Sequence, residues 1–397
     1  MQQTQIEPSA RTEIPALDLA SSVGNPVHVD AAPAHAPAQS ERTTQKSCPH
    51  PAHKLTNLFP ARDFITGHDF KVAHCAACGF AVTTPQPGPH EIAGYYPIGY
   101  YGAVEQRRFP GMVENLQNAL YSLRVREVEA VEEVGRGVPT APQQRRVLDV
   151  GCGRGVLLQE FRCRGWEVQG TELSEQAASY ARQSLKIPVE LGSLEDIRFP
   201  ANHFDAIILW HVLEHVTDPR SLLAEINRIL KPGGVLLVSV PNFDSFEARV
   251  CKDRWFHLDV PRHITHFSET TLQEVLTEKG FEVRHKTGFA PEYDFFSFIQ
   301  SALNLCGLRH NLLYDVVRGK TAKVLTGEPA PKWQILASLV LGTLLGILSF
   351  PATLLAGFLG QGGTISILAT KQAQPSTYSE AAWSVLTPAL KRRLAQP

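Results

Sequence analysis

Residues 147–155 read VLDVGCGRG, an apolar stretch that runs into three glycines, Gly151, Gly153 and Gly155. Glycine has no Cβ, so such a turn lets backbone N–H groups approach a ligand, and the start of a following helix adds more of them. The spacing is G-x-G-x-G, because Val156 follows Gly155, and the G-x-G-x-x-G fingerprint of dinucleotide enzymes is not met. The stretch therefore predicts a ligand-binding turn and disfavours nicotinamide and flavin cofactors.

Short apolar strands alternate with helices around this turn. We expect strands at residues 146–150, 167–172, 188–191, 204–210, 235–240, 281–286 and 364–371, and helices at 112–134, 156–162, 174–185, 219–230 and 268–279. This alternation is typical of a parallel sheet covered by helices on both faces. The predicted fold class is α/β, with a doubly wound, mainly parallel, seven-stranded sheet.

An acid follows at the end of the second expected strand. Glu172 stands 17 residues past Gly155. In a doubly wound sheet both positions fall at the carboxyl edge near the switch point, where an acid can hold the two hydroxyls of a ribose. We therefore expect a nucleoside as the ligand.

The composition excludes several classes of protein. Lys plus Arg number 38 against 39 Asp plus Glu in 397 residues, so no nucleic-acid partner is expected. Seven cysteines with one close C-x-x-C pair fit reduced thiols and a metal better than disulfides. The first thirty residues lack a basic start followed by an apolar run, so we expect no secretory signal and a cytoplasmic protein.

The chain divides by composition into seven parts. We expect a disordered tail at 1–45, a small separate Cys/His module at 46–105, a linker helix at 106–144, a core at 145–290, an apolar helical insert at 291–360, a last core strand at 361–372 and a tail at 373–397.

Five ordered motifs resemble the class I S-adenosylmethionine-dependent methyltransferases. They are LDVGCGRG at 148–155, Glu172, FD at 204–205, HVLEH at 211–215 and LKPGG at 230–234, and the resemblance covers residues 145–289. The chain looks most like the branch that contains ubiquinone-pathway O-methyltransferases, and PRHITHFS at 261–268 is similar to a motif of that branch. The resemblance implies S-adenosylmethionine as the cofactor.

The resemblance also implies which residues bind this cofactor. Asp149, Gly151 and Gly153 would line its methionine end, and Glu172 would bind its ribose. The full set it places at the cofactor is Asp149, Gly151, Gly153, Gly155, Glu172, Ser193 and Leu194. Ser193 stands where the family often has an acid near the adenine.

Four histidines are candidates for a general base. Methyl transfer from a sulfonium needs alignment more than side-chain chemistry, but a hydroxyl acceptor must lose its proton, and imidazole titrates near neutral pH. We favour His215, with His263 second and His211 third, while His266 stays a candidate. For each of them, a structural role or a helix cap is the alternative.

The HVLEH motif at 211–215 also allows a metal site as an alternative. In some ubiquinone-type O-methyltransferases an E-x-x-E-H run after the fourth strand holds a divalent ion that orients a catechol. Here His211 replaces the first acid, while Glu214 and His215 remain. Carboxylates suit magnesium better than imidazole does, so this site is disfavoured.

A second metal site is expected in the Cys/His module. Cys75 and Cys78 have the spacing of a zinc knuckle. Related proteins usually offer a second pair upstream, where this chain has Cys48 and His53, with His50 as the alternative to His53. The predicted ligand set is Cys48, His53, Cys75 and Cys78, holding a structural zinc in a zinc-ribbon-like module. A ribbon without metal, or a free thiol pair, is the other interpretation.

Residues 333–370 contain no charged side chain. About twenty apolar residues span a bilayer, but the apolar stretch is divided by Pro351 and by Gly342, Gly346, Gly357 and Gly360. A helical hairpin dipping into one leaflet and an internal packing element both compete with a crossing. We favour peripheral contact with the inner face of a membrane, which would bring the enzyme to a lipid-linked acceptor.

The function predicted from these observations is S-adenosylmethionine-dependent methylation, on oxygen of a small or lipid-linked acceptor. Two alternatives remain at this point. One is a nucleotide-dependent dehydrogenase built on a similar sheet, and the other is a non-catalytic membrane-associated binding protein.

Overall fold

The computed structural model describes residues 48, 50–88, 91–96, 111–136, 144–318 and 330–372. These described residues belong to one compact unit. The tails expected at 1–45 and 373–397 lie outside the described residues.

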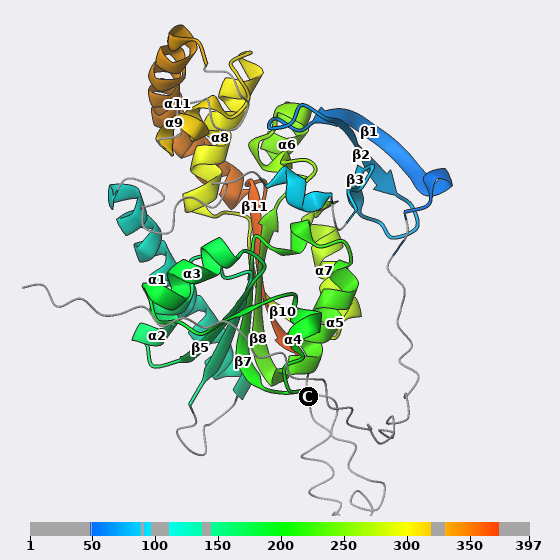
Figure 1. The fold of residues 1–397 in the computed structure, drawn as a ribbon, viewed down its shortest axis with the longest axis vertical. Coiled ribbons are helices and arrows are strands. Elements are labelled where there is room, and N and C mark those ends of the chain that lie inside the picture. Colours follow the sequence, from blue (N-terminus) through cyan, green and yellow to red (C-terminus); the bar gives the residue numbers. More distant parts are fainter. Residues whose placement is uncertain are drawn as a thin grey trace, which may run out of the picture. The chain divides into compact units, whose positions relative to one another are not determined.

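A seven-stranded sheet forms the centre of the fold (Figure 1). Its strand order is β10-β11-β8-β7-β4-β5-β6, and all neighbours are parallel except β11, which is antiparallel to both β8 and β10. The strands are β4 Arg146–Val150, β5 Glu167–Glu172, β6 Val189–Leu191, β7 Phe204–Trp210, β8 Leu230–Pro241, β10 Phe281–Thr287 and β11 Thr364–Lys371. The predicted fold class is confirmed.

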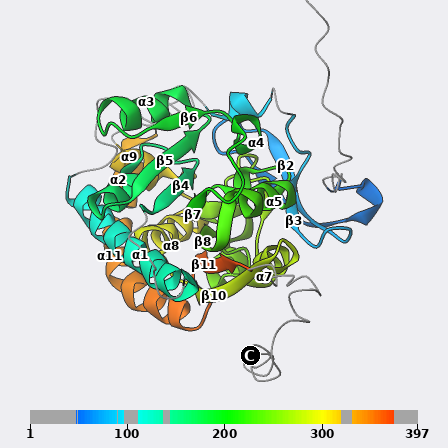
Figure 2. The same cartoon turned by 90° about the horizontal axis from the view of Figure 1, so that it is seen from below.

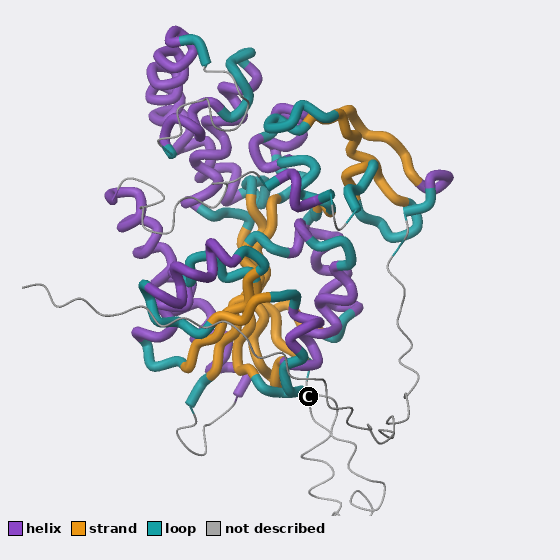
Figure 3. Tube along the Cα trace, viewed as in Figure 1, coloured by secondary structure: helices purple, strands orange, loops and turns teal. Residues whose placement is uncertain are grey.

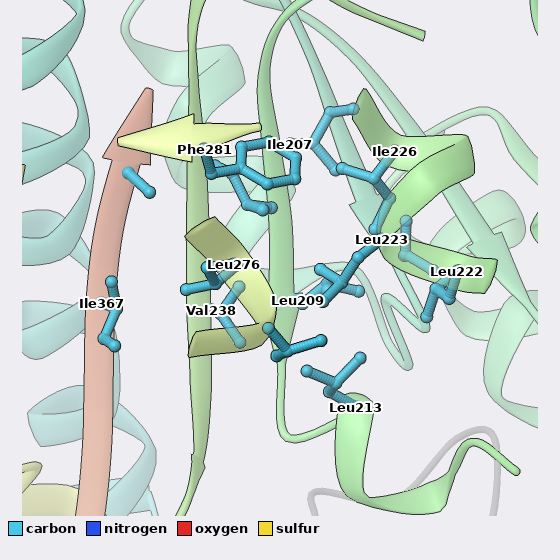
Figure 4. Packing of buried hydrophobic residues seen from close by; sticks show 14 of the residues in the cluster. Ile207, Leu209, Leu213, Leu222, Leu223, Ile226, Val238, Leu276, Phe281 and Ile367 are labelled. Carbon is cyan, nitrogen blue, oxygen red and sulfur yellow. The ribbon is translucent and has the colours of Figure 1, made fainter. Parts of the chain in front are cut away.

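Helices cover both faces of this sheet, as Figure 2 shows end-on. One face carries α1 Gly111–Arg136, α2 Val156–Cys163 and α3 Glu175–Gln183, and the other carries α4 Leu194–Ile197, α5 Pro219–Ile229 and α7 Glu269–Glu278. Ser174, Asp218 and Ser268 cap α3, α5 and α7 with side-chain acceptors. The second face packs side chains of α5 and α7 onto β7, β8 and β11, in the cluster drawn in Figure 4.

A smaller sheet joins the Cys/His module to the core. It comprises β1 Leu55–Arg62, β2 Asp69–Cys75, β3 Ala81–Thr84 and, from the core, β9 Thr265–His266 (Figure 3). Asp63 and Arg262 form an ion pair of 2.8 Å between the two parts, with both side chains fully buried. The expectation of a separate module is therefore wrong, because a core strand completes its sheet.

Among the described residues, three helices follow the core. They are α8 Pro291–Leu305, α9 Leu312–Val317 and α11 Lys332–Phe358. The helical hairpin, one of the alternatives for the apolar run, does not form, since α11 continues through Pro351 as one helix. By length and composition α11 could span a bilayer.

Glycines let α11 pack closely on one side. A Cβ on Gly342 would lie 2.9 Å from Leu313 of α9, and one on Gly357 would lie 2.7 Å from Phe289. One face of α11 is therefore covered by its neighbours α8 and α9, which lie beside it in Figure 1.

The remaining helical segments of the described residues are α6 Phe246–Cys251 and the short turns at Ala52–Lys54, Ile92–Tyr95, Leu213–His215, Lys252–Arg254 and Phe256–Leu258.

Candidate functional site

The glycine turn after β4 has the backbone that only glycine adopts readily. Gly151, Gly153 and Gly155 have φ of 67°, 54° and 71°. A Cβ on Gly151 would lie 2.8 Å from Val212, so the chain after β7 packs against the turn. A Cβ on Gly153 would meet nothing within 4 Å. The turn is closed at Gly151 and open at Gly153, where a ligand has room.

Glu172 at the end of β5 reaches this turn. Its Oε2 accepts the N–H of Gly153 at 2.8 Å, and its Oε1 accepts the N–H groups of Leu173 and Ser174 at 2.8 and 2.9 Å. A carboxylate offers about four acceptor positions. Three of them are occupied by these N–H groups, so one remains for a ligand hydroxyl. Glu172 is buried and faces the mouth of the turn, as a ribose-binding acid must.

Asp149 is a second acid beneath the turn. It lies near the end of β4 and is buried. Burial and, to a lesser extent, the nearby charge of Glu172 raise the pKa of Asp149 to about 8, so its ionised form lacks a stabilising counter-charge. Two neighbouring acids favour a ligand that brings positive charge, as a sulfonium compound does.

The two residues expected near the adenine have other roles as well. Ser193 caps α4: its hydroxyl donates to Asp196 Oδ2 at 2.7 Å and accepts the N–H of Asp196. The side chain of Leu194 lies in the core, so only its backbone can reach a ligand. Leu173, which the sequence did not indicate, is an apolar side chain 77% exposed beside Glu172. It offers a surface for a flat base.

His211 directly follows β7 and has an unusual backbone. Its φ is +52°, a conformation that costs roughly 1–3 kcal/mol in non-glycine residues and clusters at functional sites. Its Nδ1 lies 3.2 Å from Glu214 Oε1, and since a carboxylate only accepts, Nδ1 carries the proton. Burial lowers the pKa of His211 to about 4. At neutral pH the ring is therefore neutral, with its lone pair on Nε2.

Aromatic rings surround His211. The ring of Tyr293, from α8, lies 4.3 Å away, and the ring of His257 stacks at 6.0 Å. Trp210 donates from Nε1 to the hydroxyl of Tyr293 at 3.2 Å. The sequence missed Tyr293, His257 and Trp210 as site residues, because the motifs of the core mark none of them.

A buried ion pair lies beside these rings. Arg124 of α1 donates to Glu292 of α8, and its guanidinium stacks over the ring of Trp210 at 3.6 Å. A buried polar atom without a partner costs about 1–3 kcal/mol. Among the described residues several such atoms gather here: Arg124 Nε, His211 Nε2, Glu214 Oε2, His257 Nε2 and Glu292 Oε2. A polar ligand next to His211 would satisfy them.

His215 and His263 form a second group with Glu214. One ligand atom from each lies within 4.8 Å of the others. His215 Nδ1 donates to the carbonyl of Arg262 at 2.9 Å, and His263 Nδ1 donates to that of His257 at 2.7 Å. Both Nε2 lone pairs are therefore available, as in a metal site whose imidazoles are oriented by backbone carbonyls. Two nitrogens and one carboxylate suit a transition-metal dication better than magnesium.

His266 lies away from this group. Its Nε2 is 3.0 Å from the hydroxyl of Thr83, in the small sheet. Burial lowers the pKa of His266 to about 3. The side chain joins β9 to β3, and its position gives it a structural role.

The Cys/His module brings four ligand atoms together, but not the predicted four. Cys48, His50, Cys75 and Cys78 have ligand atoms within 4.8 Å of one another. His53 lies in an exposed turn outside this group, so its assignment as a ligand is wrong. His50 takes its place because its positive φ of 44° turns the chain toward Cys78, whose Sγ is 3.5 Å from His50 Nδ1. The set suits tetrahedral zinc.

The strand order completes the description. A parallel sheet with one antiparallel strand, β11, inserted between β8 and β10 differs from the all-parallel order of dinucleotide enzymes.

A family model described as a methyltransferase domain matches residues 122–286. The ubiquinone biosynthesis O-methyltransferase of Thiobacillus denitrificans is 34% identical over 158 residues, 36% of this chain and 67% of the relative. The chain belongs to the class I S-adenosylmethionine-dependent methyltransferases.

Two further similar proteins match different shares of the chain. The ubiquinone biosynthesis O-methyltransferase of Alkalilimnicola ehrlichii is 40% identical over 106 residues, and the match covers 25% of this methyltransferase and 42% of the relative. The chain thus spans two thirds of one relative and less than half of the other. A solved S-adenosylmethionine-dependent methyltransferase from Archaeoglobus fulgidus is 19% identical, with a TM-score of 0.37 over 64% of this chain and 94% of that one.

The ribose-binding role of Glu172 can be tested by Glu172→Gln. Loss of the charge weakens the hydrogen bonds to the turn and to the sugar, and charge-assisted bonds contribute about 1.5–3 kcal/mol. We expect S-adenosylhomocysteine to bind roughly 10–100-fold more weakly by calorimetry. Glu190→Gln, at an exposed position of the neighbouring strand β6, is the control and should change nothing. Equal affinities of the two variants would remove Glu172 from the cofactor site.

The zinc ligands can be distinguished by two histidine variants. We expect the native methyltransferase to hold one zinc ion per chain and His50→Ala to lose it, because three ligands remain. His53→Ala should keep the metal. Zinc content of the purified variants, measured by mass spectrometry, is the readout. Zinc loss from His53→Ala alone would contradict the assignment.

Proposed function

We propose that this methyltransferase transfers the methyl group of S-adenosylmethionine to a hydroxyl oxygen of an aromatic acceptor such as a quinone precursor. The observation that carries the proposal is the dyad of His211 and Glu214, with the buried Nε2 of His211 left without a partner. Its relatives of similar sequence are ubiquinone biosynthesis O-methyltransferases. Aromatic side chains beside His211 suit an aromatic acceptor.

The position of the dyad supports its role as general base. Val150 of β4 pairs with Leu209 of β7, so the glycine turn and His211 leave neighbouring strands at the same level. The turn and Glu172 would hold the cofactor, while His211 Nε2 accepts the hydroxyl proton as oxygen attacks the methyl carbon. Glu214 stabilises the imidazolium that forms. In this proposal His211 replaces His215, our first choice from the sequence, because a ring nitrogen of His215 groups with Glu214 and His263 within 4.8 Å.

A divalent ion on Glu214, His215 and His263 fits the same proposal. Such an ion would supply positive charge that lowers the pKa of the acceptor hydroxyl. The protein's own contribution there is orientation: the carbonyls of Arg262 and His257 fix the two imidazoles.

We further propose that the acceptor is lipid-linked and that α11 rests on the inner face of a membrane. At 1.5 Å per residue, the 27 residues of α11 extend about 40 Å, and after Lys332 they carry no charge. The side opposite α8 and α9 exposes apolar side chains, Ile347, Leu348 and Phe358 among them, at 71%, 68% and 87%. Because α8 and α9 cover one face of α11, we favour a helix that lies in the plane of the membrane–water interface over one that crosses the bilayer.

The base can be tested by His211→Gln with a 4-alkylcatechol as acceptor and labelled S-adenosylmethionine. We expect kcat to fall by roughly 10²–10⁴ while S-adenosylhomocysteine affinity is retained. His285→Gln, at an exposed position of β10, is the control. A variant with native kcat would exclude His211 as the base.

The pH profile gives an independent test. A general base works unprotonated, and burial lowers the pKa of His211 to about 4. The native rate at pH 5.5 should therefore equal that at pH 7.5, since protonation begins only as the pH falls toward 4. A base with the ordinary histidine pKa of about 6.5 would have lost most of its activity at pH 5.5.

Membrane contact can be tested by flotation with phospholipid vesicles. Replacing Ile347 and Phe358 by Glu should lower the bound fraction about tenfold or more, because charges are costly among acyl chains. Leu123→Glu, an exposed apolar position on α1, is the control. Unchanged flotation of the α11 variant would argue against this surface.

A further inference from the structure

A cavity of about 320 Å³ lies between α6, α8, α11 and the chain that leads into β11. Its walls are mostly apolar, with Phe298 from α8, Leu355 from α11 and Leu359, which directly follows α11. The predicted function uses none of these residues. Two acids, Glu247 and Asp294, nevertheless lie at its floor.

The two carboxyl groups converge on one point. A methyl group placed on Gly363 would lie 3.3 Å from Asp294 Oδ1 and 3.3 Å from Glu247 Oε2. Ser297 and Ser301 donate to Glu247 Oε1, each at 2.5 Å, and leave Oε2 toward this point. Both acids are therefore aimed at the same small volume.

One of these oxygens lacks a donor. Asp294 is 2% exposed, and its Oδ2 accepts the N–H of Ala290 at 3.1 Å, while Oδ1 has no hydrogen-bond partner. The hydroxyl of Thr364 lies close enough to lower the pKa of Asp294, yet it too lacks a partner of normal geometry. Burial outweighs this effect and raises the pKa of Asp294 to about 8. A cation supplied by a ligand would give Asp294 Oδ1 a partner and would stabilise the buried carboxylate charge.

The rim of the cavity carries the opposite charge. Arg249 of α6 lines it, exposed to solvent, and donates to Gln361. Beyond the rim stands the exposed apolar face of α11, with Leu355 at 59% and Leu359 at 61%. From the floor of the cavity outward, a ligand would therefore meet two carboxyl groups, then a guanidinium group, and then an apolar surface.

We infer that this cavity binds the headgroup of an ethanolamine phospholipid. The primary ammonium lies between Asp294 and Glu247, the phosphate pairs with Arg249, and the acyl chains follow α11. A zwitterionic headgroup matches the order of charges, and a primary ammonium supplies the N–H donors that Asp294 Oδ1 lacks. The inference deepens the membrane contact proposed above and rests on it, while methyl transfer itself is not required.

The site is separate from the catalytic cluster. Consecutive residues of the first turn of α8 serve the two places: Glu292 and Tyr293 contact the surroundings of His211, and Asp294 lines the cavity. The lipid is therefore a bound partner and not the methyl acceptor.

Calorimetry with monomeric short-chain lipids tests the inference without a membrane. The full chain should bind dihexanoyl phosphatidylethanolamine at least about tenfold more tightly than dihexanoyl phosphatidylcholine or dihexanoyl phosphatidylglycerol. Free phosphoethanolamine should bind about tenfold more weakly than the lipid, because it lacks the chains; equal binding would identify a soluble ligand and overturn the lipid assignment.

Two variants locate the binding. Asp294→Asn should weaken the ethanolamine lipid about tenfold, with S-adenosylhomocysteine affinity retained as evidence of folding. Arg249→Gln, at an exposed position, should weaken the lipid but leave hexylammonium binding unchanged, whereas Asp244→Asn, exposed nearby, should change neither. Equal binding of all three lipids, or none by the native chain, would overturn the inference even if catechol methylation and flotation succeed. So would transfer of labelled methyl to the ethanolamine nitrogen.

Discussion

The hydrogen bond from Gly153 N–H to the Glu172 carboxylate is the interaction on which the site depends. It joins the ends of β4 and β5, and it holds open a turn in which three glycines have positive φ. The same carboxylate accepts two more N–H groups at the start of the chain toward α3. One buried charge thereby fixes both backbone segments that face the cofactor. Burial raises the pKa of the adjoining Asp149, so a cationic methyl donor, which stabilises the ionised form of this carboxyl group, is favoured over the neutral product.

The Cys/His module contributes to the same edge of the sheet. Its strand β3 pairs with β9, and Thr83 donates to the carbonyl of His263 at 2.6 Å. Asp63 holds Arg262 in the interior, and the carbonyl of Arg262 accepts from His215. The module is thus built into the segment that orients both imidazoles, and a zinc ion that rigidifies β1 and β2 would also fix the catalytic side of the molecule.

The sequence predicts the elements whose signal is local. Apolar runs and caps such as Ser268 give the strands and helices of the core, and glycine spacing with Glu172 indicates the cofactor mouth. Contacts between distant segments had no such signal. Leu230 fits the apolar face of the preceding helix but pairs with Phe204 as the first residue of β8. The two-residue strand β9 is too short to show a period, and the choice of His50 over His53 depends on one backbone angle. The ion pair of Arg124 with Glu292 joins α1 to α8, two helices far apart in the sequence, and no residue spacing predicts such a contact.

The first turn of α8 links the two proposed sites physically. Tyr293 lies against His211 at 4.3 Å, and Asp294, the next residue, accepts the N–H of Ala290 that begins the turn. Asp294 and Glu247 converge on one point beside Gly363, and burial raises the pKa of Asp294, so a cation bound there would stabilise the ionised carboxylates. The proposed membrane contact and the proposed acceptor site thus share one turn of α8, in which Asp294 serves the first and Tyr293 the second.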